Sequence, residues 1–290
     1  MRHDPRTEAF ERLDGAYEVR VLEPSPPAVD EPPWFADDPA ARGDVPGGRT
    51  LVSPVSSGDR SWDELAAHDP GLADWCADRW LGAWRRLEPL PDRFPGCREV
   101  LHAVAERTVS PAREAATGKI GLRYTRGGFG TPFFGDDEQV RVEGTELVRV
   151  RRGEQAFRDA IPGVEAASAA ALADWYGFVT WALEELRATA APELDSSSRV
   201  QLWPEHFDVA TDLGVQEAGS RATYGGSPGD PDHPEPYLYV LPLGAAPQGE
   251  LWQASGFAGA ELAYAELLAA ADQRAAALEF FRTRLDALVG

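Results

Sequence analysis

The chain has 290 residues and a formal net charge of −20, with 43% hydrophobic and 26% charged residues. This length and composition are typical of a globular protein that buries a substantial core. The negative charge argues against a nucleic-acid partner, because phosphate backbones repel an acidic surface. No apolar run approaches the roughly 18 residues that cross a bilayer, and the charged N-terminus lacks a secretory leader. We therefore expect a cytoplasmic protein without a membrane segment.

The first 60 residues are expected to form a separate N-terminal segment. A short strand is predicted at 17–22, and the Pro-, Gly- and Asp-rich stretch at 23–48 favours an irregular connection. Residues 61–290 are expected to form one globular domain, with a possible internal boundary near 191–198.

Helices are predicted in the first part of this domain. Residues 61–64 have the Ser-x-x-Glu spacing of a capping box. Helices are expected at 72–86 and 97–116, and three prolines between them explain the interruption, because proline removes an amide donor and clashes with the preceding turn. His102 is expected on the flank of the second helix.

The pattern then changes from helical to alternating. Residues 119–125 place apolar and polar side chains on opposite faces, which predicts a strand. Two further alternating segments meet at Gly144 and predict a β-hairpin. A helix with one apolar stripe is expected at 166–188.

The remainder is predicted as strands closed by a helix. Strand-like segments lie at 199–203, 206–211, 220–226 and 236–243, and a helix is expected at 264–288. Strands grouped between helices, without regular βαβ alternation, predict an α+β fold with a mainly antiparallel sheet packed against several helices.

The glycine-rich segment at 126–132 does not match a known phosphate-binding motif. A P-loop requires Gly-Lys-Ser/Thr leading into a helix, and Gly118-Lys119 leads into the predicted strand instead. We interpret the segment as a flexible turn, in which glycine adopts positive φ without steric cost. Gly127–Gly130 could alternatively form the rim of a binding site.

A second glycine-rich segment, around Ser227, matches the Gly-x-Ser-x-Gly pattern of the nucleophile elbow. The oxyanion hole of such an enzyme uses the backbone amide after the nucleophile, and Pro228 has no amide hydrogen. Only six residues separate Ser227 from His233, which leaves no room for the intervening elements of a hydrolase. A turn explains residues 227–230 better.

The best candidate site lies in the segment from Trp203 to Tyr239. On an extended strand, His206 and Asp208 share a face, as do His233 and Glu235. Such histidine–carboxylate pairs suit small-molecule binding, general acid–base chemistry or a metal site, and they also serve as structural hydrogen-bonding groups. We assign no metal ligand and expect no cofactor. The candidate ligand-binding residues are Trp203, His206, Asp208, His233, Glu235 and Tyr237.

The same region resembles a known family. The runs LWPEHFD (202–208), SPGD (227–230), PEPYLYV (234–240) and the stretch GFAGAELAYAELLAAADQRAAALEFFRTRL resemble a bacterial, actinobacterial-type domain of unknown function. The resemblance covers about residues 199–288. It implies a bacterial cytoplasmic setting and assigns no catalytic residues.

The sequence therefore predicts a small-molecule-binding protein of unspecified ligand. One alternative is a hydrolase- or isomerase-type enzyme that uses His206 or His233 with a neighbouring carboxylate. Another is an acidic module that binds a basic protein partner, for which we would expect a flat, exposed apolar patch.

Overall fold

The computed structural model describes residues 86–125, 127–132, 134, 138–151, 154–190, 200–231, 233–244 and 247–290. The strand expected at 17–22, the capping box at 61–64 and nearly all of the helix expected at 72–86 lie outside these residues. So do both positions expected for domain boundaries, near 60 and at 191–198.

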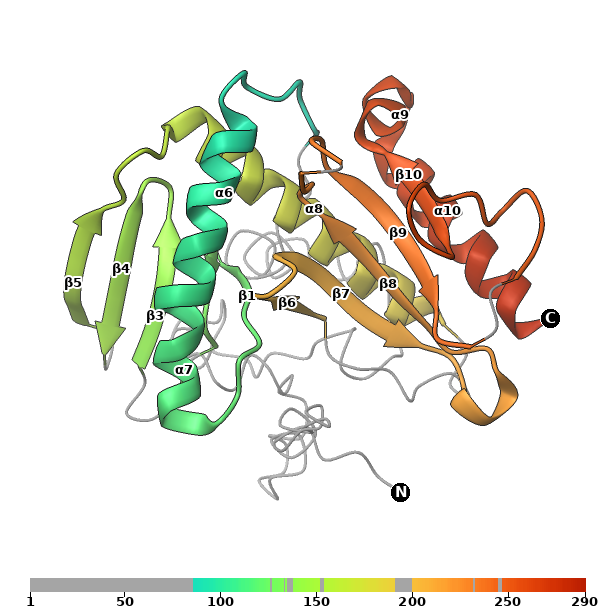
Figure 1. The fold of residues 1–290 in the computed structure, drawn as a ribbon, viewed down its shortest axis with the longest axis horizontal. Helices are drawn as coiled ribbons and strands as arrows, with labels where there is room; N and C mark the ends of the chain where they lie inside the picture. Colours follow the sequence, from blue (N-terminus) through green and yellow to red (C-terminus); the bar gives the residue numbers. More distant parts are fainter. Residues whose placement is uncertain are drawn as a thin grey trace, which may run out of the picture.

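Within this part of the chain, two five-stranded antiparallel sheets are packed with helices (Figure 1). The strands of the first sheet follow one another in the order β1-β2-β3-β4-β5, and those of the second in the order β10-β9-β8-β7-β6. This confirms the predicted α+β fold. The strands are β1 Arg123–Thr125, β2 Gly128–Gly130, β3 Glu138–Glu143, β4 Glu146–Arg151, β5 Glu154–Ala160, β6 Gln201–Trp203, β7 Asp208–Leu213, β8 Ala222–Ser227, β9 Tyr237–Pro242 and β10 Ala260–Ala263.

The helices confirm the two segments expected at 97–116 and 166–188. The first is a continuous helical segment that contains one π-helical turn. The second, α8, is the longest helix described and is buried along most of its length. The helical elements are α6 Phe94–Val104, η3 Ala105–Val109, α7 Ser110–Thr117, α8 Ala166–Thr189, the short 3-10 helix η5 Gln216–Ala218, α9 Tyr264–Ala269 and α10 Gln273–Val289.

Helix α8 joins the two sheets into one core. It contacts β1 and β2 of the first sheet, β7 and β8 of the second, and both α6 and α10. Its Trp175, Tyr176 and Phe178 are fully buried within a single hydrophobic cluster that runs from Leu87 to Leu285. Helix α6 also packs against α8. This arrangement holds α6 beside the second sheet, although about a hundred residues separate the two in the sequence.

The predicted hairpin is confirmed, whereas the strand expected at 119–125 is shorter than predicted. Strands β3 and β4 pair up to Glu143 and Glu146, and Gly144 adopts a φ of 62° in the two-residue turn between them. Only Arg123–Thr125 form the strand β1. The carbonyl of Ile120 accepts a hydrogen bond from the Ser110 side chain of α7 at 2.8 Å. This carbonyl is therefore paired with a helix side chain and not with the backbone of a neighbouring strand.

The glycine-rich segment was wrongly predicted as a flexible turn. Gly128–Gly130 form the buried strand β2, which pairs with both β1 and β3. A Cβ atom on Gly130 would lie 2.8 Å from the carbonyl oxygen of Val140, so the absence of a side chain allows the close approach of β3. Of these glycines only Gly127, with a φ of 78°, uses a conformation that favours glycine.

The closing helix was wrongly predicted as one continuous element. Helix α9 ends at Ala269 and α10 begins at Gln273, because Asp272 adopts an extended backbone and its side chain accepts a hydrogen bond from the amide of Ala275 at 3.1 Å. Aspartate is among the best N-capping residues, so a local signal starts a new helix within the apolar stripe.

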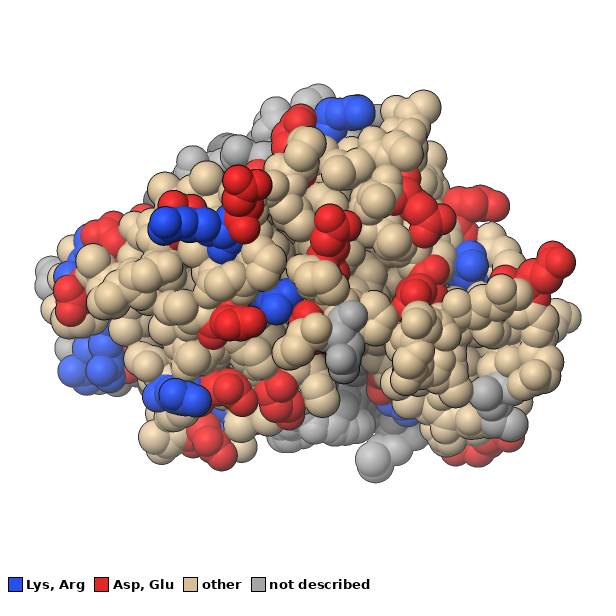
Figure 2. Space-filling model, turned by 45° about the horizontal axis from the view of Figure 1, so that its top comes forward, with Lys and Arg blue, Asp and Glu red and all other residues tan. Residues whose placement is uncertain are grey.

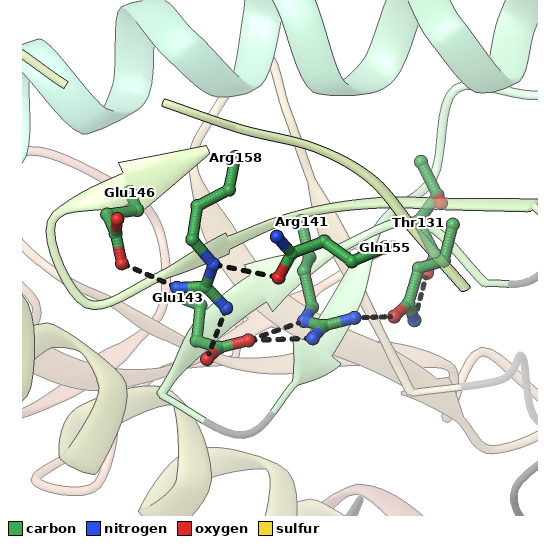
Figure 3. Close-up of polar contacts among 7 residues, drawn as sticks. Thr131, Arg141, Glu143, Glu146, Gln155 and Arg158 are labelled. Carbon is green, nitrogen blue, oxygen red and sulfur yellow. Dashed lines mark hydrogen bonds and ion pairs between the residues drawn. The ribbon is translucent and has the colours of Figure 1, made fainter. Parts of the chain in front are cut away.

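Besides β2, two further strands were not predicted. Strand β5 has no apolar alternation because Gln155–Ala160 are all exposed. It is held by pairing with β4 and by the polar network in Figure 3, in which Arg158 contacts Glu143 and Glu146 and Arg141 contacts Glu143. Strand β10 pairs with β9 and is only four residues long.

A candidate ligand cavity beside the second sheet

A cavity of about 570 Å³ lies where α6 faces the second sheet. Its size is within the range of small-molecule sites. The lining residues come from α6, the β6–β7 turn, β7, the end of β8 and the loop that follows it, β9, and the segment before β10. They are Arg98, Glu99, His102, Glu205, His206, Asp208, Ser227, Gly229, Asp230, Pro231, Tyr237, Tyr239, Leu241 and Phe257.

Strand alternation decides which side chains of β9 reach this cavity. Leu238 and Val240 are fully buried in the core. A Cβ atom on Gly226 would lie 2.9 Å from Val179 of α8 and 3.2 Å from Leu238, so this face of the sheet packs on α8. Successive side chains of a strand point to opposite faces, and Tyr237 and Tyr239 therefore line the cavity on the other face.

His206 was wrongly expected on an extended strand with Asp208: it lies in the turn between β6 and β7, and this turn brings both residues to the cavity. Phe207 lies between them with a φ of 57°, the one residue other than glycine with positive φ in the described part of the chain. Its amide donates to the carbonyl of Trp203 at 2.7 Å, and its carbonyl accepts from the buried Tyr176 hydroxyl at 2.7 Å. These contacts fix the turn despite the unfavourable backbone conformation.

The Phe207 ring packs among other aromatic rings and is not itself a lining residue of the cavity. It stacks on His102 with the ring centres 4.9 Å apart and meets Phe129 and Tyr176 edge to face. His102 was expected on a helix flank, but its Nε2 lies 2.9 Å from the carbonyl oxygen of Pro204. The histidine therefore ties α6 to the β6–β7 turn.

Asp208 is the most unusual group in the cavity. Its side chain is 7% exposed, and the Tyr239 hydroxyl donates to its Oδ2. Its Oδ1 is buried and has no hydrogen-bond partner among the described residues. Burial raises the pKa of Asp208, although the hydrogen bond from Tyr239 and the nearby His206 act in the opposite direction. A buried carboxylate with a vacant acceptor costs free energy unless a ligand supplies a donor.

The other tyrosine belongs to the loop that closes the cavity. The Tyr237 hydroxyl donates to Asp230 at 3.3 Å, and burial raises the pKa of Tyr237 to about 12. Asp230 itself caps a tight turn, because its Oδ1 accepts from the amide of His233 at 2.9 Å. On the opposite wall, Arg98 of α6 donates to the carbonyl of Pro234 at 3.2 Å and holds this loop against the helix.

Three of the six predicted site residues line the cavity: His206, Asp208 and Tyr237. His233 is not a lining residue; its ring contacts that of Tyr237, with ring centres 4.9 Å apart. Its Nδ1 lies 3.7 Å from the Asp230 carboxylate, and its Nε2 lies 3.7 Å from the Glu261 carboxylate. Trp203 and Glu235 are not among the lining residues, and Glu235 is exposed.

The rim proposed at Gly127–Gly130 is also not part of this cavity, because Gly128–Gly130 form β2 in the first sheet. Within the described residues, no group of three or more His, Cys, Asp or Glu side chains could hold a metal ion.

Sequence reasoning missed the residues that α6 contributes and two side chains of β9. Tyr239 and Leu241 share the alternating face of Tyr237, so the strand period could have identified them. No local signal marks Arg98, Glu99 or His102, because only the packing of α6 on α8 brings them to the site.

The surface contains no concentrated basic region on the face drawn in Figure 2, where acidic side chains are widespread and basic ones lie among them. The arginines of β3–β5 are also engaged: Arg141 and Arg158 contact Glu143, and Arg149 contacts Glu138. None of the helices in the described part of the chain is both long and apolar enough to span a membrane.

Comparison with protein-family models, with curated proteins and with solved structures finds no match to this chain. The function therefore has to be argued from the cavity itself.

Replacing Asp208 by asparagine is expected to stabilise the protein near neutral pH by about 0.5–2 kcal/mol. The raised pKa means that the folded state favours the protonated carboxyl, so its contribution to stability is present at low pH and is lost as the pH rises through the folded-state pKa. Asparagine carries no charge and keeps an oxygen for the Tyr239 hydroxyl.

Urea denaturation of the wild type and of the Asp208→Asn variant, from about pH 4 to about pH 8, measures this change in stability. The difference in unfolding free energy should grow with pH. Ionisable groups that the two proteins share largely cancel from this difference. An asparagine variant that is less stable than the wild type near neutral pH would show that Asp208 is a stabilising structural group.

Proposed function

We propose that this protein binds a small molecule in the cavity between α6 and the second sheet. One observation carries the proposal: a nearly buried carboxylate, Asp208, lines a ligand-sized cavity and has an oxygen without a partner. Structural carboxylates are normally saturated with hydrogen bonds, because desolvation without compensation is costly. A ligand donor that reaches this carboxylate would supply the missing bond.

The composition of the walls supports a binding role. Apolar contact surface comes from Tyr237, Tyr239, Leu241 and Phe257, while a few polar groups converge from other elements. Mainly apolar walls with a small number of placed polar groups are characteristic of ligand sites, in which the polar groups set orientation. Such a site would serve a bacterial cytoplasmic protein, the setting implied by the family resemblance.

Binding accounts for the geometry better than acid–base catalysis does. General acid–base pairs work at hydrogen-bond distance, about 2.6–3.2 Å. The His233 nitrogens lie 3.7 Å from their carboxylates, and His206 makes no hydrogen bond to a carboxylate within the described residues.

The described residues give no support to the other alternative, an interaction module with an exposed apolar patch. The large apolar residues that are exposed, Phe157, Leu243 and Val289, lie on separate elements.

A ligand screen, combined with a substitution that occupies the cavity, tests the proposal. In a thermal-shift screen of amines, alcohols, carboxylates, sugars and nucleosides, we expect at least one class to raise the melting temperature of the full-length protein. A ligand present at about 100 times its Kd stabilises the folded state by about 2.7 kcal/mol. Leu241→Trp fills the cavity and should abolish the shift.

The matched control is Leu243→Trp, two residues further along the chain, where the side chain is 42% exposed and outside the cavity. This variant should keep the shift. If no class stabilises the wild type, or if Leu241→Trp responds as the wild type does, the cavity is not a ligand site.

A further inference from the structure

The charge of the cavity identifies the class of ligand. Four carboxylates line it, those of Glu99, Glu205, Asp208 and Asp230, against a single arginine. That arginine, Arg98, is already engaged: Nη1 donates to the carbonyl of Pro234, and Nη2 lies 3.8 Å from Glu99. Two histidines, His102 and His206, also line the cavity, so the four carboxylates still outnumber the groups that can carry positive charge, and the cavity favours a cation.

Asp208 supplies the specific anchor within this field. Its Oδ2 accepts from Tyr239, whereas Oδ1 is buried without a partner among the described residues. An ionised carboxylate only accepts hydrogen bonds, so a ligand that completes it must bring an N–H or O–H group. A charged donor gives the stronger bond, because charge-assisted hydrogen bonds are about twice as strong as neutral ones.

Aromatic rings form the wall next to this anchor. Tyr237 and Tyr239 have ring centres 6.2 Å apart, and Phe257 meets Tyr239 nearly perpendicularly at 6.3 Å. Aromatic faces attract cations, and the same rings provide apolar contact for a hydrocarbon portion. An ammonium group attached to an apolar body matches both features.

We propose that the ligand is a small organic cation, an amine with an apolar or aromatic portion, whose ammonium group pairs with the carboxylate of Asp208. This inference rests on the proposed function and adds to it the sign of the ligand charge and the contacting group. Arg98 then holds the loop after β8 against α6, and Tyr239 holds the carboxylate in place.

Three probes of similar shape and different charge test the inference: 2-phenylethylamine, 2-phenylethanol and phenylacetate. Isothermal titration calorimetry on the full-length protein near neutral pH gives the three dissociation constants. We expect the amine to bind about tenfold or more tightly than the alcohol, and phenylacetate not to bind. Equal or tighter binding of the alcohol or the acid would overturn the inference.

Two variants then locate the charge. Asp208→Asn should weaken amine binding about tenfold and leave binding of the alcohol nearly unchanged. Asp159→Asn makes the same change on the exposed strand β5, away from the cavity, and should have no effect. Unchanged amine affinity in a folded Asp208→Asn protein would overturn the assignment. The comparison of the three probes on the wild type decides the charge class even if that variant does not fold.

The outcomes also separate this inference from the proposed function. If neutral or anionic compounds bind and Leu241→Trp blocks them, the cavity is a ligand site and only the cationic class is wrong. If no compound of any class binds, the proposed function fails together with the inference.

Discussion

Replacing Phe207 by alanine is expected to lower the free energy of unfolding by about 3–5 kcal/mol, the range for a buried phenylalanine. The residue is 1% exposed, and its ring contacts Phe129, Tyr176 and His102, of which only His102 lines the cavity. Alanine leaves a void among three aromatic rings and retains the unfavourable positive φ of this position. Thermal and urea denaturation measure the loss.

Phe157→Ala is the matched control, because this phenylalanine is 45% exposed on β5. Its effect should stay within about 0.5 kcal/mol, as for most surface substitutions. The turn at Phe207 also sets the positions of His206 and Asp208, so any ligand found for the cavity should bind more weakly to the Phe207→Ala protein. Similar losses for the two variants would show that these aromatic contacts do not hold the turn.

Replacing Gly225 by alanine is expected to destabilise the protein by about 1–3 kcal/mol, the usual cost of overpacking. Gly225 of β8 pairs directly with Tyr239 of β9, and the tyrosine ring lies across the glycine. A Cβ atom there would lie 2.5 Å from both the hydroxyl oxygen and Cζ of Tyr239. The ring has to move, and its hydrogen bond to Asp208 is lost with it.

Gly96→Ala makes the same change where space is open. Gly96 lies in α6, and a Cβ atom on it would meet no atom within 4 Å. This variant should be stabilised by about 0.5–1 kcal/mol, because alanine restricts the unfolded chain more than glycine does. Denaturation of both variants gives the comparison. A Gly225→Ala protein as stable as the wild type would mean that the Tyr239 ring can leave its place without cost.

The cavity combines features that individually have structural explanations. Buried tyrosines, a capped turn and a helix tied to a loop all occur in proteins without ligands. The unpartnered oxygen of Asp208 is the feature that favours a ligand, because stability alone would favour a neutral or fully bonded side chain at this position. A group that costs stability where it lines a cavity is characteristic of functional sites.

Several parts of the fold were predictable from local patterns. The apolar stripe of 166–188 identified α8, and alternation around Gly144 identified the β3–β4 hairpin, because these periods follow directly from helix and strand geometry. The missing amide of Pro228 and the short distance to His233 argued against a nucleophile elbow at Ser227. Ser227 instead ends β8, and its Oγ accepts from the amide of Gly229 at 3.1 Å.

Local patterns failed where a neighbouring element decides the conformation. Glycines at 128 and 130 looked like a turn, since a sequence does not show that β3 will approach within contact distance. The exposed strand β5 had no apolar period, because pairing with β4 and ion pairs hold it rather than burial. The break before α10 depends on Asp272, whose capping role was hidden within an apolar stripe.

The sequence by itself determined the acidic character and the α+β class, since those follow from composition and from the periods of helices and strands; it also identified His206 and Asp208 as candidates, although a turn and not strand alternation brings them together. Only the tertiary structure brought Arg98 and His102 of α6 to that site, moved His233 behind Tyr237 and excluded Glu235. The physical reason is that α6 and the second sheet meet through α8, and such long-range packing leaves no local signature in the chain.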